Sequence, residues 1–106
     1  MTTLTDGIPV ISLAGEIDHH TGDALRHALE DASGTPRPRV VGDMRHVTYI
    51  DSSGINIFIA AHCALSEAGG WPRLAAIGEP ISRTLSLVGI DAVIDCRETL
   101  RHALTN

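Results

Sequence analysis

The sequence has few of the residues that would indicate binding to nucleic acid, insertion into a membrane or cross-linking by disulfides. Of its 106 residues only 3% are aromatic, and 8 Lys or Arg stand against 13 Asp or Glu. The net charge of -5 argues against a surface that binds nucleic acid or an anionic membrane. No apolar run approaches the roughly 20 residues of a membrane span. The N-terminus also lacks the basic and apolar regions of a signal peptide, so we expect a cytoplasmic protein.

Cysteine is scarce as well, and the two that are present stand far apart in sequence. Cys63 falls in a helical pattern and Cys96 near the end of a predicted strand. This separation excludes a closely spaced metal-binding pair. In a reducing compartment each is expected to be a free, buried thiol.

What the chain does have is enough apolar sequence for one core. Apolar residues make up 43% of it and charged residues 20%, which is typical of a globular protein. The length fits a single domain spanning residues 1–106. Because aromatic residues are rare, the core must be built from Val, Ile, Leu and Ala.

Hydrophobic periodicity predicts an alternation of strands and helices. The predicted strands are 4–6, 8–14, 39–44, 73–77 and 90–95, and the predicted helices are 22–32, 54–68, 80–88 and 97–104, with loops at 15–21 and 45–47. In the third helix Ile81, Leu85 and Val88 are expected to form the buried face. The order β-β-α-β-α-β-α-β-α predicts an α/β fold whose sheet is parallel apart from an N-terminal edge hairpin.

The stretch from Thr48 to Asn56 passes from a β-rich run into an apolar segment with helical spacing. Between them lie Asp51, Ser52, Ser53 and Gly54. Asp and Ser are favoured helix N-caps, and Gly54 lacks a Cβ that would keep another molecule's backbone or a phosphate away. Ser52 is therefore expected on the surface beside the positive end of a helix dipole, where a phosphoryl group would be partly stabilised. An ordinary helix cap beside a tight turn explains the same residues.

Acidic residues follow three of the predicted strands. Ligands of parallel sheets bind beyond the carboxyl ends of the strands, which would bring Asp18, Asp43 and Asp51 to one face around Ser52. Such a patch would orient a hydroxyl or help to hold a nucleotide-bound metal, although caps and turns use the same residues. The run Asp18-His19-His20 is not predicted to bind a metal, because adjacent histidines do not share a helix face and no third ligand is evident.

Four segments together resemble a known family. The loop Gly15-Glu16-Ile17-Asp18 and the string from Val47 to Ile55 are similar to the signature of STAS domains, the anti-anti-sigma factors (anti-sigma factor antagonists) of bacteria. Ala68-Gly69-Gly70 and Leu87-Val88-Gly89-Ile90 match family positions in the same order. The resemblance covers nearly the whole chain and implies the STAS fold.

The resemblance implies a binding switch and not an enzyme, with no cofactor of its own. Family members bind an anti-sigma factor that is also a serine kinase of the GHKL ATPase type, and so release the sigma factor. The kinase uses ATP and magnesium to phosphorylate the serine that matches Ser52, which ends binding, and a PP2C-type phosphatase reverses the step. Asp18 matches a loop position near the kinase, Asp51 the acid beside the acceptor, and Ser53 and Gly54 the start of the helix. The free protein is expected to be a monomer.

Two residues depart from the family pattern. Gly42 stands where a bulky apolar residue is common, so the third strand is expected to pack less tightly. Asn56 stands where a small residue is usual, a change expected to bear on the choice of partner.

Two other functions remain open from the sequence. A STAS adaptor subunit of another ATPase or signalling complex would share the fold without this phosphorylation cycle. A small hydrolase would use Ser52 with an acid and a histidine such as His46, but the serine lies in Asp-Ser-Ser-Gly and not in a Gly-x-Ser-x-Gly elbow.

Overall fold

The computed structural model describes residues 2–18, 21–32, 34 and 36–105 of the chain. The strands are β1 (Thr2–Thr5), β2 (Ile8–Ile17), β3 (Arg39–Ile50), β4 (Trp71–Ala75) and β5 (Asp95–Arg97), and the helices are α1 (Gly22–Ala32), α2 (Ser52–Glu67), α3 (Glu79–Leu87), the short 3-10 helix η1 (Ile90–Ala92) and α4 (Leu100–Leu104). Within this part of the chain, no helix combines the length and the hydropathy that crossing a membrane requires.

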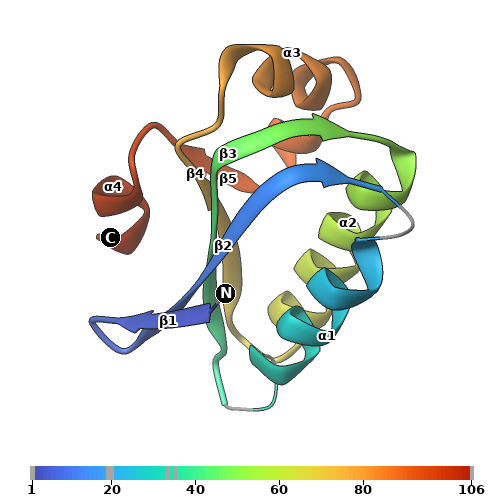
Figure 1. The fold of residues 1–106 in the computed structure, drawn as a ribbon. Coiled ribbons are helices and arrows are strands. Elements are labelled where there is room, and N and C mark those ends of the chain that lie inside the picture. Colours follow the sequence, from blue (N-terminus) through green and yellow to red (C-terminus); the bar gives the residue numbers. More distant parts are fainter. Residues whose placement is uncertain (1, 19–20, 33, 35, 106) are drawn as a thin grey trace.

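The five strands form one sheet in the order β1-β2-β3-β4-β5. β1 and β2 make an antiparallel hairpin, and the remaining neighbours pair in parallel. Figure 1 shows α1 and α2 against one face of the sheet, α4 against the other, and α3 beyond the end of β4. The predicted α/β fold, with a mostly parallel sheet and an antiparallel N-terminal hairpin, is confirmed.

The sheet separates two hydrophobic cores. The larger core lies between the sheet and helices α1, α2 and α3, and it includes Met44, Phe58 and Leu65. The smaller core lies under α4 and includes Val41, Ala75 and Ala103. These cores together bury β3 on both of its faces, since neighbouring residues on that strand point to opposite sides. Burial on both faces explains the apolar run at the start of β3.

The central strands are longer than the sequence predicted. β2 continues to Ile17 and β3 runs without a break from Arg39 to Ile50, so the predicted loops at 15–17 and 45–47 are wrong. The two strands pair along this whole length, through register shifts near Leu13 and between Gly15 and Glu16. The shifts disturb the strict alternation by which strands are predicted.

The C-terminal third also departs from the prediction. β4 ends at Ala75, because Ala76 adopts the left-handed conformation with φ 56°. The predicted strand at 90–95 is instead η1 followed by β5, and α4 begins only at Leu100. Val88, predicted to be buried, is 55% exposed.

Both cysteines are free in the described structure, but they are less buried than expected. Cys63 is exposed on α2, so its predicted burial is wrong, whereas Cys96 is half-buried. Burial, together with the nearby Asp91 and Asp95 carboxylates, raises the pKa of the Cys96 thiol to about 11.

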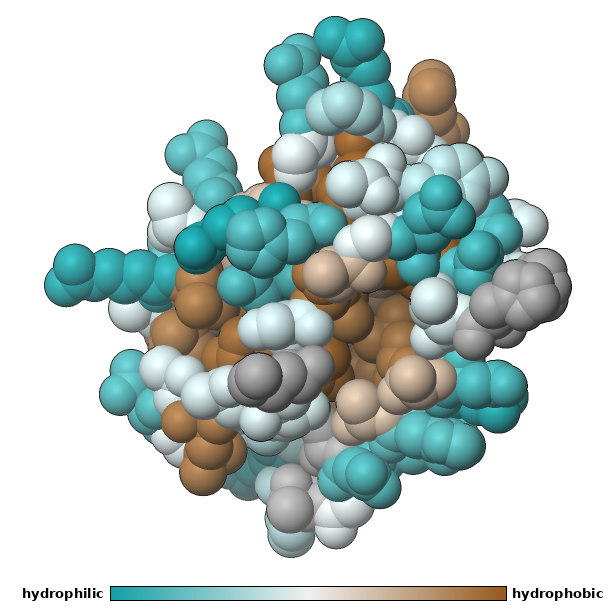
Figure 2. Space-filling view, in the orientation of Figure 1, coloured by the Kyte–Doolittle hydropathy of each residue, from teal (hydrophilic) through white to brown (hydrophobic). Residues whose placement is uncertain are grey.

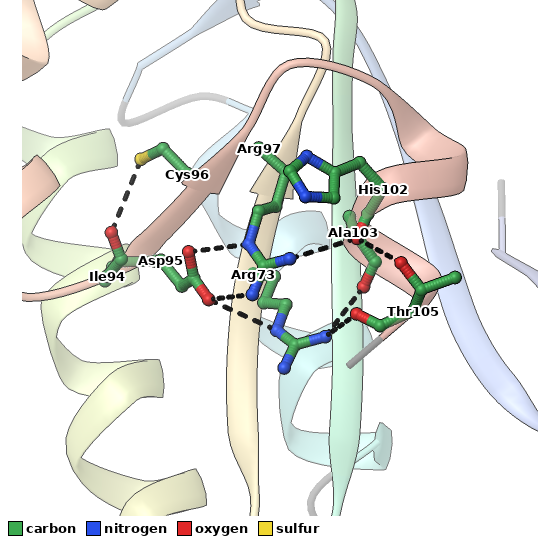
Figure 3. Close-up of polar contacts among 8 residues, drawn as sticks. All are labelled: Arg73, Ile94, Asp95, Cys96, Arg97, His102, Ala103 and Thr105. Atoms are coloured by element: carbon green, nitrogen blue, oxygen red, sulfur yellow. Dashed lines mark hydrogen bonds and ion pairs between the residues drawn. The ribbon is translucent and has the colours of Figure 1, made fainter.

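A cluster of charged side chains fixes the short helix α4 to the edge of the sheet (Figure 3). Asp95 accepts two hydrogen bonds from Arg97, at 2.8 and 2.7 Å, and lies 3.4 Å from Nε of Arg73. Arg73 in turn donates to the carbonyl oxygens of Ala103 and Thr105, at 3.1 and 2.9 Å. Cations are favourable at a helix C-terminus, so the two arginines stabilise α4 where its own hydrogen bonds end.

The cluster predicts how stability depends on pH. The Arg97 hydrogen bonds hold the pKa of Asp95 below its ordinary value. A carboxyl whose pKa is depressed by folding contributes stability above its unfolded pKa of about 3.9, and this contribution is lost as the pH falls through the lower, folded value. Asp95→Asn is therefore expected to lower the free energy of unfolding at pH 7 by about 1 kcal/mol or less, since the side chain is partly exposed.

Urea unfolding of the wild type and Asp95→Asn at pH 7, 5 and 3 measures this effect. The difference in the free energy of unfolding should persist at pH 5 and shrink at pH 3. Asp23→Asn is the control, because Asp23 forms an ion pair with Arg26 on an exposed face of α1. An equal loss in both variants would contradict a specific role for the cluster.

Candidate functional site

The site lies where β3 ends and α2 begins, beside the end of β2 (Figure 1). Asp51 occupies the N-cap position with extended backbone, φ -113° and ψ -173°. Its carboxylate accepts hydrogen bonds from the backbone N–H groups of Ser53 and Gly54, at 2.9 and 3.2 Å. The backbone N–H of Asp51 donates to the carbonyl of Ile17, at 3.2 Å. One aspartate therefore caps the helix and joins it to β2, so Asp51, and neither serine, is the N-cap.

Ser52 is the first residue of α2 and its side chain is exposed. Its hydroxyl makes no hydrogen bond with any described residue, whereas Ser53 is half-buried behind it. Asn56, one turn further along the helix, is also exposed. Ser52 thus lies on the surface at a strand–helix junction, and no described residue forms a hydrogen bond with its hydroxyl.

The missing side chain of Gly54 allows close packing inside the protein and does not open space for another molecule. A Cβ at this position would lie 2.7 Å from Cγ2 of Ile17 and 2.9 Å from Cγ1 of Ile50. Gly54 is buried, so the first turn of α2 packs directly on the ends of β2 and β3. The prediction that Gly54 leaves room for a phosphate or a partner's backbone is therefore wrong.

In the loop after β2, hydrogen bonds to Thr21 fix the position of Asp18. The backbone N–H of Asp18 donates to Oγ1 of Thr21 at 3.0 Å, and the backbone N–H of Thr21 donates to Oδ1 of Asp18 at 3.1 Å. The Thr21 hydroxyl also donates to the carbonyl of Glu16, at 2.7 Å. Sequence reasoning missed this reciprocal bonding, for which the three-residue spacing of Asp18 and Thr21 is the signal. His19 and His20 lie outside the described residues.

Asp43 does not belong to the same cluster. It lies within β3, paired with Ser12 on one side and Ala75 on the other, and its carboxylate accepts from the N–H of Arg45 at 3.1 Å. The prediction that Asp43 closes the strand beside Asp51 is wrong, because β3 continues to Ile50. The acids near Ser52 are Asp51, which precedes it, and Asp18. Asp18 directly follows Ile17, whose carbonyl accepts the N–H of Asp51.

The chemistry available at this junction is limited. His46 lies in β3 and pairs with Ala14 of β2, and among the described residues no base contacts the Ser52 hydroxyl to activate it as a nucleophile. In the described ranges no three His, Cys, Asp or Glu side chains gather as metal ligands. The Asp51 carboxylate already occupies two of the N–H groups that would otherwise bind an anion. The feature of this junction that can take part in chemistry is therefore the exposed Ser52 hydroxyl beside Asp18 and Asp51.

The chain is similar in sequence and fold to several known proteins. The chain is 25% identical over 100 residues to an anti-sigma F factor antagonist from Paenibacillus polymyxa, covering 93% of this chain and 86% of the relative. The structure of an anti-sigma factor antagonist from Mycobacterium paratuberculosis superposes with a TM-score of 0.86 at 30% identity, covering 98% and 88% of the two chains. The Bacillus protein SpoIIAA in its phosphorylated form shares the fold, with a TM-score of 0.73 at 19% identity and coverage of 98% and 95%.

The family model described as "STAS domain" matches residues 1–103, which include every described strand and helix except the last residue of α4. The junction of β3 with α2 lies well inside the matched range. The chain belongs to the STAS-domain family.

Proposed function

We propose that this protein is an anti-sigma factor antagonist regulated by phosphorylation of Ser52. In the unmodified state the start of α2 and the Asp18 loop bind an anti-sigma factor that is also a serine kinase of the GHKL ATPase type, and the sigma factor is released. The kinase transfers the γ-phosphoryl group of ATP to Ser52, which ends binding. A PP2C-type phosphatase restores the hydroxyl. The cycle takes place in the cytoplasm, and the protein acts by binding and not by catalysis.

The observation that carries the proposal is the exposed hydroxyl of Ser52 on the first turn of α2, which has no hydrogen-bond partner among the residues that the structure describes. A kinase must reach its acceptor without unfolding the substrate, and nothing in the described structure covers this one. Relatives named anti-sigma factor antagonists support the same assignment.

The local charges explain why a phosphate would oppose binding. It adds about -1.5 to -2 charges at neutral pH. The Asp51 carboxylate lies next to it and already takes the N–H groups of Ser53 and Gly54. These two N–H groups are therefore not free to neutralise the phosphate, contrary to the expectation from the helix dipole alone. A partner that fits a neutral serine would have to desolvate a dianion beside a carboxylate.

The test is mass spectrometry after incubation with ATP, magnesium and each kinase-type anti-sigma factor of the host. One added phosphate is expected on the wild type and on Ser53→Ala, and none on Ser52→Ala. Ser53 is a matched control because it is the adjacent serine and is only half-buried.

Two other results would revise the proposal. A phosphate lost only in Ser53→Ala would move the acceptor by one residue. No phosphate in any mixture, with tight binding to a different ATPase, would refute the cycle and favour the constitutive STAS adaptor.

A further inference from the structure

A groove between α1 and α2 lies outside the site described above. The two helices cover the same face of the sheet (Figure 1), and the groove between them has a volume of about 320 Å³. Its walls are apolar and consist of Leu29, Ile57, Ala60, Ala61, Ala64 and Leu65. Among the described residues, Asp18, Asp51 and Ser52 are not part of the lining, so the proposed phosphorylation does not account for the groove.

The walls of the groove favour an apolar ligand over water. Leu65 is fully buried at the groove and Leu29 is 9% exposed. Water molecules against such walls find few hydrogen-bond partners, and replacing poorly ordered water with apolar atoms increases affinity. Ala60 and Ala64 are exposed, so the groove is open to solvent and a ligand can enter while the protein stays folded.

The charged residues of the groove are exposed at its rim, and they are already paired. Figure 2 shows hydrophilic side chains over the part of α1 that is turned away from β2. Nη2 of Arg26 lies 3.0 Å from Oδ1 of Asp23, and its Nε lies 4.0 Å from Oε1 of Glu30, the other charged residue of the lining. An ionised group in the groove would lose water without gaining an unpaired opposite charge, so the rim favours an uncharged ligand.

Asn56 supplies a neutral polar group at the groove. It is exposed, it lines the groove from α2, and no described residue forms a hydrogen bond with its side chain. A side-chain amide has both donors and an acceptor. Asn56 can therefore bind a hydroxyl, a carbonyl or another amide group of a ligand.

The size of the groove indicates a small molecule and not a protein. Its volume is at the lower end of the range of about 300 to 1,000 Å³ that is typical of small-molecule sites. Nine described residues line it, whereas each side of a standard protein interface has about 20 to 30 residues.

We propose that the groove between α1 and α2 binds a small uncharged amphiphile that has an alkyl or aromatic body and one neutral hydrogen-bonding group. The body lies against the apolar walls, and the polar group binds the amide of Asn56. This site is separate from the proposed function, and its test needs no protein partner.

Titration of the full-length, isotope-labelled protein with 1-octanol, followed by NMR, tests the site. The backbone amide signals of Ile57, Ala60, Ala61 and Ala64 should shift and reach saturation. Octanoate and octylammonium have the same alkyl chain with a negative or a positive end. Each should bind at least about 10-fold more weakly than 1-octanol, because its charge would lose water in the groove. Asn56→Ala should weaken the binding of 1-octanol about 3-fold or more, since one hydrogen bond is lost.

A matched pair of variants tests the location. Ala64→Leu fills the groove from an exposed position on α2 and should weaken the binding of 1-octanol about 10-fold or more. Ala24→Leu is the control, because it makes the same change at an exposed position on α1 that lines a separate hollow beside β2. Its affinity should stay within about 2-fold of wild type, as expected for a distant, independent position. Unfolding by urea checks that both variants are folded.

Several outcomes would overturn the proposal. Equal affinity for the three probes would overturn the preference for an uncharged ligand, and equal losses in Ala64→Leu and Ala24→Leu would overturn the location. Unchanged affinity in Asn56→Ala would overturn the role of its amide. The absence of saturable shifts with 1-octanol would overturn the site as a whole. If Ala64→Leu then weakened the binding of a kinase-type anti-sigma factor, the groove would belong to the interface with that protein.

Discussion

Gly70→Ala is expected to destabilise the protein by about 3 kcal/mol, near the upper end of the usual cost of overpacking. A Cβ at Gly70 would overlap the backbone carbonyl of Pro38. Trp71, the next residue, donates its N–H to this carbonyl at 2.9 Å, and Gly70 itself donates to Leu65 at 2.8 Å. Because the overlapping atoms belong to the backbone of Pro38, the overlap can be removed only if the start of β4 moves away from β3.

Urea unfolding compares this variant with Gly78→Ala. At Gly78, the N-cap of α3, an added Cβ would meet nothing within 4 Å beyond its chain neighbours and φ is -65°, so the change should cost about 1 kcal/mol or less, the usual difference between Gly and Ala at an N-cap. A similar small cost in both variants would mean that the β3–β4 junction adjusts easily.

Ser52→Asp is expected to weaken binding to the kinase-type anti-sigma factor about 100-fold, which corresponds to about 2.7 kcal/mol. The new carboxylate would stand on the first turn of α2, next to the Asp51 carboxylate that caps it. The partner would have to desolvate the added charge and accept like charges side by side. The phosphorylated protein carries more charge and should bind at least as weakly. Isothermal titration of the three forms measures the difference.

Ser66→Asp is the control for this prediction. It places the same charge on an exposed residue of the same helix, near the opposite end. Its affinity should remain close to that of wild type. Wild-type affinity in Ser52→Asp and in the phosphorylated protein would refute the electrostatic switch.

The sequence predicted the fold class well because the helices repeat their apolar residues regularly. α1 runs from Gly22 to Ala32 as predicted, and glycines or prolines mark several of the turns. Prediction failed where tertiary pairing decides the backbone. Arg45 and His46 resemble a loop in sequence, yet they belong to β3, where His46 pairs with Ala14 of the neighbouring β2.

The sequence also could not predict how side chains on neighbouring strands pack against one another. Gly42 was expected to loosen β3, but Cδ2 of Leu74 lies 3.1 Å from where its Cβ would be, so the neighbouring strand fills the space. Whether Asn56 changes the choice of partner stays a prediction.

At the site, the sequence predicted the exposed serine and the helix cap, but it did not predict which acidic residues lie near them. The order Asp-Ser-Ser-Gly between a strand and a helix predicted an exposed serine beside a capped helix, and the structure has this arrangement. The place of Asp43 depended on where β3 ends, and no local motif encodes the length of that strand.

The Asp51 cap has a consequence for where the energy of a phosphorylation at Ser52 would act. Because Asp51 already accepts from the N–H groups of Ser53 and Gly54, these two groups are not available to a phosphate, and among the described residues the Ser52 hydroxyl has no hydrogen bond that a phosphate must break. The modified and unmodified chains should then melt at nearly the same temperature. The phosphate would then change the affinity for a binding partner and leave the stability of the fold nearly unchanged.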